Sequence, residues 1–255
     1  ILPRLLGCTT LAREAGSLYD DDGCSNNKDD VVTPFRNQFA NFRKKIMAPQ
    51  PAQAHDDINA VGEARPRLIC GLGNPGKKYQ NTRHNVGFQF IDAIIKKNNF
   101  KLIKKNKSKE IYRGLIKDNE CLLCKPIVFM NLSGSSIQEV VNFYKILKSN
   151  IIVVHDDLDL PLGKIKIKLG GGNGGHNGLL SIDQSIGVTY NRLRIGIGHP
   201  SSNKSVNKYV LEKFNAEEKK TINKIIDLSV EHIDLLFSKK ELFLTKISLL
   251  FRKNL

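Results

Sequence analysis

The segment that decides the fold is residues 68–85, LICGLGNPGKKYQNTRHN. Its apolar start predicts a short buried strand, and the turn at 71–76 has the G-x-G-x-x-G spacing that can bind a dinucleotide pyrophosphate. A dinucleotide site also needs an apolar helical stripe next and an acidic residue about 20 positions on. Residues 77–85 are polar and residues 95–105 contain no acid. We therefore predict no nicotinamide or flavin site.

Beyond this turn the chain alternates between strand and helix patterns. The continuous β-branched run at 151–154 is typical of a strand buried on both faces, and KIKIK at 164–168 alternates strictly. These patterns predict a single α/β domain whose mixed, largely parallel sheet is flanked by helices in three layers, α/β/α. Predicted strands cover 68–71, 110–117, 121–125, 151–154, 164–168 and 192–198; predicted helices cover 86–97, 216–237 and a segment capped by Ser133 or Ser135.

The charge of the chain is uneven. Net charge is +15 over 255 residues; residues 1–66 hold 8 Lys/Arg and 9 Asp/Glu, whereas residues 67–255 hold 32 and 16. This excess favours a polyanionic partner, nucleic acid before membrane, although a Lys-rich codon bias explains the bulk charge equally well. No apolar run approaches the roughly 18 residues of a membrane span, so we expect a soluble protein.

Residues 1–66 have a different composition from the rest. They contain acidic clusters and little periodicity, and they lack the features of a transit peptide or secretory signal. We interpret them as a mostly disordered extension, native or derived from the gene model, and residues 67–255 as the folded domain. Five scattered cysteines indicate a reducing compartment. Cys121 and Cys124 have metal-ligand spacing, but we interpret them as core thiols.

Polar residues follow the ends of the predicted strands, where ligands bind in open α/β sheets. A histidine paired with an aspartate can activate water, and asparagines can hold a water, an amide or an oxyanion without charge. The set contains no nucleophilic serine motif and no metal motif, so it predicts a hydrolytic site. Taken singly, His84, His155 and His199 could equally be capping, packed or turn residues, and the glycine-rich loop at 170–175 could be only flexible. The strand ends carry Asn74, Tyr79, His84, Asn85, Met130, Asn131, His155, Asp156, His176 and Asn177.

Six motifs occur in one order: GLGNPG-x2-Y-x2-TRHNVG, KPIVFMNLSG, VVHDDLDLPLGK, KLGGGNGGHNGL, RLRIGIGHP and YVLEKF. Together they resemble the bacterial-type peptidyl-tRNA hydrolase family over residues 67–214. The resemblance implies cleavage of the ester between a peptide and tRNA, which recycles tRNA released prematurely from ribosomes. It also implies a cytoplasmic monomer with no cofactor, no metal and no obligatory protein partner; an organellar location stays open.

The resemblance also implies roles for individual residues. His84 would be the general base that activates water, and Asp156 would orient it, with no covalent intermediate. Asn177 would steady the water or the developing oxyanion. Asn74, Met130 and Asn131 would line the pocket, and Tyr79 would flank the base. The acceptor end of tRNA would be bound by Lys166, Lys168 and Arg194, with strong salt dependence.

Two positions depart from the family pattern: Val128 stands where threonine is common, and Leu180 where a basic residue is usual. Residues 1–66 have no counterpart in the family. A plant organellar splicing factor shares this fold and acts as a binding partner of group II introns, so an RNA-binding module is the alternative function. The presence of His84, Asp156 and the motif asparagines favours the enzyme.

Overall fold

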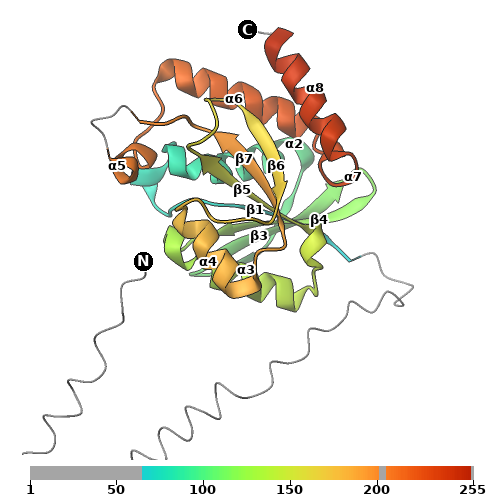
Figure 1. Cartoon of the computed structure of the whole chain (residues 1–255). Coiled ribbons are helices and arrows are strands. Elements are labelled where there is room, and N and C mark those ends of the chain that lie inside the picture. The colour runs from blue at the N-terminus through green and yellow to red at the C-terminus, as the bar shows by residue number, and fades with distance from the viewer. Residues whose placement is uncertain (1–64, 201–204, 254–255) are drawn as a thin grey trace, which may run out of the picture. The chain divides into compact units, whose positions relative to one another are not determined.

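A seven-stranded sheet runs through residues 65–200 and 205–253, the parts of the chain that the computed structural model describes (Figure 1). The strand order is β2-β3-β4-β1-β5-β7-β6. The four central strands β4, β1, β5 and β7 are parallel, and the outer ladders are antiparallel, which confirms the mixed sheet. The strands are β1 (Arg67–Gly71), β2 (Lys101–Lys105), β3 (Lys109–Ile116), β4 (Asn119–Pro126), β5 (Ile151–Asp157), β6 (Ile165–Leu169) and β7 (Asn191–Gly196).

Helices cover both faces of this sheet and complete the predicted three layers (Figure 1). One face packs against α2 (Val86–Asn98), α6 (Ala216–Glu231) and α8 (Lys240–Lys253). The other packs against α3 (Ser133–Phe143) and α4 (Asn177–Ile186). The remaining helical segments in the described part of the chain are α5 (Val206–Val210), α7 (Leu235–Ser238) and the 3-10 turns η2 (Lys77–Tyr79), η3 (Arg83–Asn85), η4 (Met130–Leu132) and η5 (Lys148–Asn150).

Alternation along the buried strands builds the two cores. In β5, Ile152 and Val154 join the cluster under α2 and α6, whereas Ile151 and Val153 join the cluster under α3 and α4. Helix α2 approaches β1 closely through Gly87, where a Cβ would lie 2.4 Å from the Leu72 nitrogen. This contact places the turn that carries His84 directly at the carboxyl end of β1.

Two local expectations are corrected, and one strand was not expected at all. Neither Ser133 nor Ser135 caps α3: Leu132 occupies the cap position without a side-chain hydrogen bond, and the Ser135 hydroxyl donates to the Leu132 carbonyl. The helix predicted over 216–237 ends at Glu231, after which the chain turns through α7 into α8. Strand β2 was not predicted, because all five of its residues are exposed and no apolar alternation marks it.

The cysteine pair lies in the core, as expected. Cys121 and Cys124 are both fully buried, and they belong to the clusters on opposite faces of the sheet. Two thiols that point to opposite faces cannot ligate one ion together. Of the described helices, none is both long enough and apolar enough to cross a membrane. The predicted extension, apart from Arg65 and Pro66, lies outside the described residues.

Candidate active site

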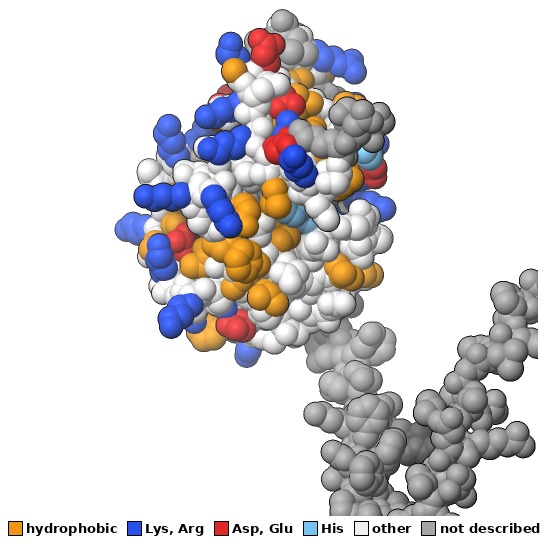
Figure 2. Space-filling model, turned by 90° about the vertical axis from the view of Figure 1, so that its left-hand side faces the viewer, with side chains coloured by type: hydrophobic (Ala, Val, Ile, Leu, Met, Phe, Trp, Pro, Cys, Tyr) orange, Lys and Arg blue, Asp and Glu red, His pale blue; other side chains and the backbone are white. Residues whose placement is uncertain are grey.

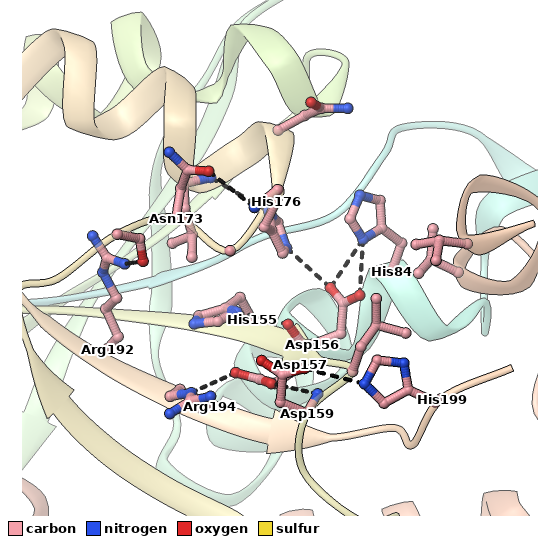
Figure 3. Close-up of a pocket in the computed structure, with 18 of the residues that line it drawn as sticks. His84, His155, Asp156, Asp157, Asp159, Asn173, His176, Arg192, Arg194 and His199 are labelled. Carbon is pink, nitrogen blue, oxygen red and sulfur yellow. Dashed lines mark hydrogen bonds and ion pairs between the residues drawn. The ribbon is translucent and has the colours of Figure 1, made fainter. Parts of the chain in front are cut away.

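His84 and Asp156 come together at the carboxyl ends of neighbouring parallel strands. His84 lies in η3, which follows β1, and Asp156 lies near the end of β5. The Nδ1 atom of His84 is 3.0 Å from each carboxylate oxygen of Asp156. Both residues are buried. The other ring nitrogen of His84, Nε2, points away from the carboxylate (Figure 3).

A second histidine binds the same carboxylate. His176 occupies the cap position of α4, where its Nδ1 accepts the backbone N–H groups of Gly178 at 3.1 Å and Leu179 at 3.4 Å. A neutral imidazole that accepts at Nδ1 carries its proton on Nε2. The Nε2–H of His176 therefore donates to Asp156 Oδ1, at 3.1 Å.

These contacts determine which atom of His84 is available for chemistry. Asp156 is a carboxylate that accepts from His176, and it also accepts the Nδ1–H of His84. Neutral His84 consequently has an unprotonated Nε2. Ligand atoms of His84, Asp156 and His176 lie within 4.8 Å of one another. A proton on His176 Nε2, held there by the amides of α4, occupies the lone pair that a metal ion would need.

The ionisation of the pair follows from burial and charge. Burial lowers the pKa of His84, but the charge of Asp156 and its hydrogen bond outweigh burial and leave that pKa above its ordinary value. Burial raises the pKa of Asp156, but the charges and hydrogen bonds of His84 and His176 hold it far below its ordinary value. Asp156 is therefore ionised at neutral pH, and the raised pKa of His84 means that it keeps its proton to a higher pH than an ordinary histidine does.

His155 is a packed neutral residue. Its Nδ1–H donates to the backbone carbonyl of Asp156 at 2.7 Å, and its ring centroid is 5.2 Å from that of His176. Burial and the nearby His176 lower the pKa of His155 to about 3. Of the histidines that sequence reasoning left open, His155 thus has the packing role, whereas His199 is exposed and pairs with Asp159 at 3.1 Å.

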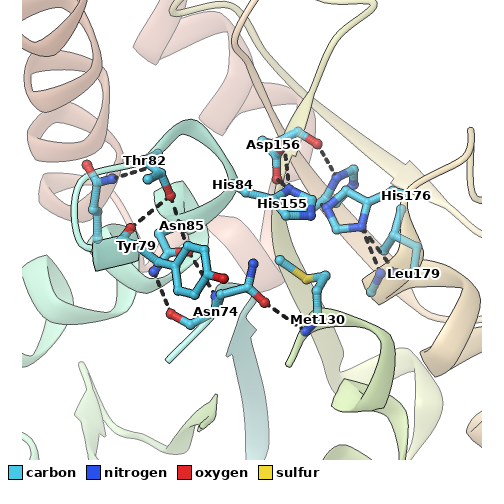
Figure 4. A network of polar contacts seen from close by, with 12 residues as sticks. Asn74, Tyr79, Thr82, His84, Asn85, Met130, His155, Asp156, His176 and Leu179 are labelled. Atoms are coloured by element: carbon cyan, nitrogen blue, oxygen red, sulfur yellow. Dashed lines mark hydrogen bonds and ion pairs between the residues drawn. The ribbon is translucent and has the colours of Figure 1, made fainter. Parts of the chain in front are cut away.

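Asn74 connects three segments beside the histidine turn (Figure 4). Its backbone N–H donates to Asn85 Oδ1, and its carbonyl accepts from Asn85 Nδ2, both at 2.9 Å. Its side-chain oxygen accepts the Met130 N–H, also at 2.9 Å. The half-buried Tyr79 lies next to this network, and its carbonyl accepts from the Thr82 hydroxyl at 2.8 Å. Asn74, Tyr79 and Met130 are thus held beside the histidine turn, but none of the three lines the cavity next to His84 and Asp156.

A cavity of about 560 Å³ opens beside His84 and Asp156. The end of the glycine-rich loop, residues 172–176, forms one wall (Figure 3). Asn177, Lys168 and Arg194 also line it, and Arg194 forms an ion pair with Asp157. Lys166 is exposed on the same face of β6 as Lys168, paired in register with Arg194. Asn131 is exposed in η4, outside this cavity.

The sequence analysis assigned no role to two residues that hold the site. One is His176, which appeared among the polar residues at the strand ends without a role, because no helix was predicted after it and histidine is not one of the usual N-cap residues. The other is Arg83, whose guanidinium binds both oxygens of Glu218, at 2.7 and 3.0 Å, and stacks 4.2 Å above the Tyr209 ring. Arg83 thereby ties the turn that carries His84 to α5 and α6. No pattern near Arg83 in the sequence indicates that its partner is Glu218, which lies 135 positions away.

Comparison with known proteins agrees with this arrangement. A sequence model of the family described as peptidyl-tRNA hydrolase matches residues 68–252. The chain is 47% identical over 182 residues to a peptidyl-tRNA hydrolase of Bartonella quintana, covering 71% of this chain and 94% of the relative. It is 46% identical to that of Rickettsia canadensis, covering 71% and 98%.

A solved structure gives the same result. The crystal structure of peptidyl-tRNA hydrolase from Acinetobacter baumannii superposes with a TM-score of 0.68 at 38% identity, covering 73% of this chain and 97% of that one. The match extends over nearly the whole length of each relative, and it includes every element that builds the site. The chain belongs to the peptidyl-tRNA hydrolase family.

Proposed function

We propose that this enzyme cleaves the ester of peptidyl-tRNA with a water molecule that His84 activates, without a covalent intermediate. The observation that carries the proposal is the Nε2 of His84, which has no hydrogen-bond partner among the described residues, on a ring whose Nδ1–H is held by Asp156. Nε2 would take the proton of water as it attacks the ester carbonyl, and Asp156 would stabilise the imidazolium that forms. An ester has a better leaving group than an amide, so one positioned base suffices.

Amides around His84 would position the reactants. Asn177 lines the cavity next to His84 and would donate to the water or to the developing oxyanion. The oxygen of Asn74 is engaged by Met130, so its amide NH₂ would face the substrate. Asn131 and Met130 would contact the peptide, and Tyr79 would flank the base. Since none of these groups needs a metal or cofactor, we propose that the reaction uses neither.

The basic side chains of β6 and β7 would bind the tRNA. Lys166 and Lys168 are exposed on one face of β6, and Arg194 shares that face through its register with Lys166. Arg194 is already paired with Asp157, so the two lysines would supply most of the charge that neutralises phosphates of the acceptor end. We further propose a monomer that acts in the cytoplasm without an obligatory protein partner, as the family resemblance implies.

The test is release of the N-blocked amino acid from N-acetyl-aminoacyl-tRNA, with and without chelator, by the parent chain and by His84→Ala. His232→Ala is the matched control, because His232 lies at the end of α6 and outside the cavity. We expect chelator-resistant release by the parent and the control and a loss of about 10²- to 10⁴-fold in His84→Ala. Near-normal release by His84→Ala would refute the mechanism. A folded parent that binds tRNA without releasing product would instead favour the RNA-binding module.

A further inference from the structure

A second cavity, of about 470 Å³, lies where β2 and β3 at the edge of the sheet meet α3. The buried Ile111 lines it from the sheet, and the buried Val140 lines it from the helix. It shares no lining residue with the cavity beside His84. We call it the edge groove, and the polar and aromatic residues that line it are Lys104, Lys109, Glu139, Asn142, Phe143 and Tyr144.

An aromatic side chain stands in solvent at the edge groove. Phe143 is 74% exposed, more than any other large apolar side chain in the described part of the chain. The ring of Tyr144 packs edge-on against the ring of Phe143, with centroids 4.8 Å apart, and the Lys104 ammonium lies 5.7 Å from the Phe143 centroid. Two neighbours thus hold the phenyl ring, and its exposed surface is available to stack with a flat ligand.

The strand that borders the edge groove is strongly basic. Residues 96–109 contain seven lysines and no acidic residue, and every residue of β2 is exposed. The buried Lys109 is neutralised by Glu139. Other lysines of this segment would attract a polyanion, because they are exposed and have no acidic partner among the described residues. In β2 and the turn after it, these are Lys101, Lys104 and Lys107.

Positive charge alone does not mark a site on this protein. Figure 2 shows Lys and Arg side chains spread over the face of the molecule that it draws. The edge groove differs from these scattered cations, because there a lysine, a cavity and an open aromatic ring meet.

The edge groove is also remote from the basic strands beside the candidate active site. Strands β2 and β6 are the two edges of the sheet. Six strand spacings of about 4.8 Å put these edges roughly 30 Å apart. An acceptor end that enters along β6 and β7 therefore does not occupy the edge groove.

We propose that the edge groove is a second RNA site, which binds an unpaired nucleotide of a strand other than the acceptor end held at His84. The base would stack on Phe143, Asn142 would form a hydrogen bond with the edge of the base, and Lys104 would bind a phosphate. The neighbouring lysines would bind the phosphates on either side. Exposed aromatic rings in a basic groove bind single strands in this way, without sequence preference.

The combination of groups favours an unpaired strand over other polyanions. An acidic peptide would use the lysines but leave the ring of Phe143 in water. Base-paired RNA keeps its bases stacked on one another and offers none to Phe143. An unpaired nucleotide uses both the ring and the ammonium groups.

Fluorescence anisotropy with a labelled oligoadenylate tests the proposal. We expect Phe143→Leu to weaken binding about tenfold and Phe143→Tyr to keep it within about twofold, because tyrosine retains a ring for stacking. Lys104→Ala should reduce the slope of log K against log salt concentration by about 0.7, the value for one phosphate contact on a single strand. The matched controls are Leu249→Ala and Lys246→Ala, both at exposed positions of α8, and they should keep the affinity and slope of the parent.

A saturating acceptor-stem duplex separates the two RNA sites. We expect the oligoadenylate to stay bound in its presence, and Phe143→Leu to release the N-blocked amino acid at the parent rate. Displacement of the oligoadenylate by the duplex overturns the second site, and equal affinity in the parent and Phe143→Leu overturns the stacking. Oligoglutamate or phosphatidylserine vesicles that bind as tightly as the oligoadenylate would assign the groove to an acidic peptide or to a membrane surface. A parent that binds the oligoadenylate through Phe143 but releases no product supports the edge groove and refutes the proposed hydrolysis.

Discussion

The exchange Asp156→Asn tests how the two histidines share one carboxylate. Asp156 accepts two N–H groups, one from His84 and one from His176. An asparagine at this position has one oxygen and one NH₂ group. The backbone amides of α4 keep the proton of His176 on Nε2, so the oxygen of the asparagine stays with His176. Its NH₂ group then faces His84 Nδ1, which must accept, and the proton of His84 moves to Nε2.

The expected loss in kcat follows from the free energy needed to restore the active tautomer of His84, which carries its proton on Nδ1. Placing the proton back on His84 Nδ1 opposes two buried donors, each of which loses a hydrogen bond worth about 1 to 3 kcal/mol. The total of about 2 to 6 kcal/mol corresponds to a loss of roughly 30- to 10⁴-fold in kcat, at about 1.4 kcal/mol per tenfold. Loss of the carboxylate also lowers the pKa of His84, since that charge is what raises it against burial. The acidic limb of the pH profile should therefore move to lower pH.

The assay is single-turnover release from N-acetyl-aminoacyl-tRNA across pH 5 to 9, with circular dichroism to verify folding. A second exchange makes the test specific. His176→Asn keeps a good helix cap but removes the imidazole donor, so Asp156→Asn combined with His176→Asn frees the amide to turn its oxygen toward His84. We expect the double variant to recover about tenfold over Asp156→Asn. Release by Asp156→Asn within about threefold of the parent, or an acidic limb that moves to higher pH, would refute this reasoning.

Three further expectations follow from the structure. Release by the parent should rise with pH as His84 loses its proton, and the midpoint should lie above about 6.5 because the pKa of His84 is raised. A midpoint below that value would mean that burial lowers the pKa of His84 by more than the Asp156 carboxylate raises it. Lys168→Ala should weaken tRNA binding and reduce the slope of log K against log salt concentration by about one unit. The control Lys246→Ala, on α8, should keep the slope of the parent. Equal slopes in the parent and Lys168→Ala would exclude a phosphate contact at Lys168. Gly87→Ala should lower the free energy of unfolding in urea by about 1 to 3 kcal/mol, because its Cβ would press on the backbone of Leu72, just after β1, and of Val154 in β5. Gly172→Ala, whose Cβ meets nothing within 4 Å, should leave the free energy of unfolding unchanged. An unchanged unfolding midpoint in Gly87→Ala would mean that α2 can move away from the sheet.

The sequence predicted the helices and strands whose burial leaves a regular pattern of apolar residues. The β-branched run at 151–154 predicted β5, because a strand that is buried on both faces is apolar at every position. The helical spacing after Val86 predicted α2, because a helix that is buried along one side repeats apolar residues every three to four positions. Strand β2 was not predicted, because an edge strand whose residues are all exposed shows no pattern of apolar residues. The single helix predicted over 216–237 failed because apolar residues continue past Glu231, and only their packing into α7 and α8 reveals the turn.

The sequence by itself determined the fold class, the strand ends that carry polar residues, and the pairing of His84 with Asp156 as an expectation. Only the tertiary structure decided that His176 shares the carboxylate, that His155 is packed and neutral, and that Arg194 is already paired with Asp157. Local patterns report burial, since burial selects residue types along a few neighbouring positions. Tautomers and pKa values depend instead on partners from distant segments, such as the 72 positions between His84 and Asp156, which only the folded chain brings within 3.0 Å.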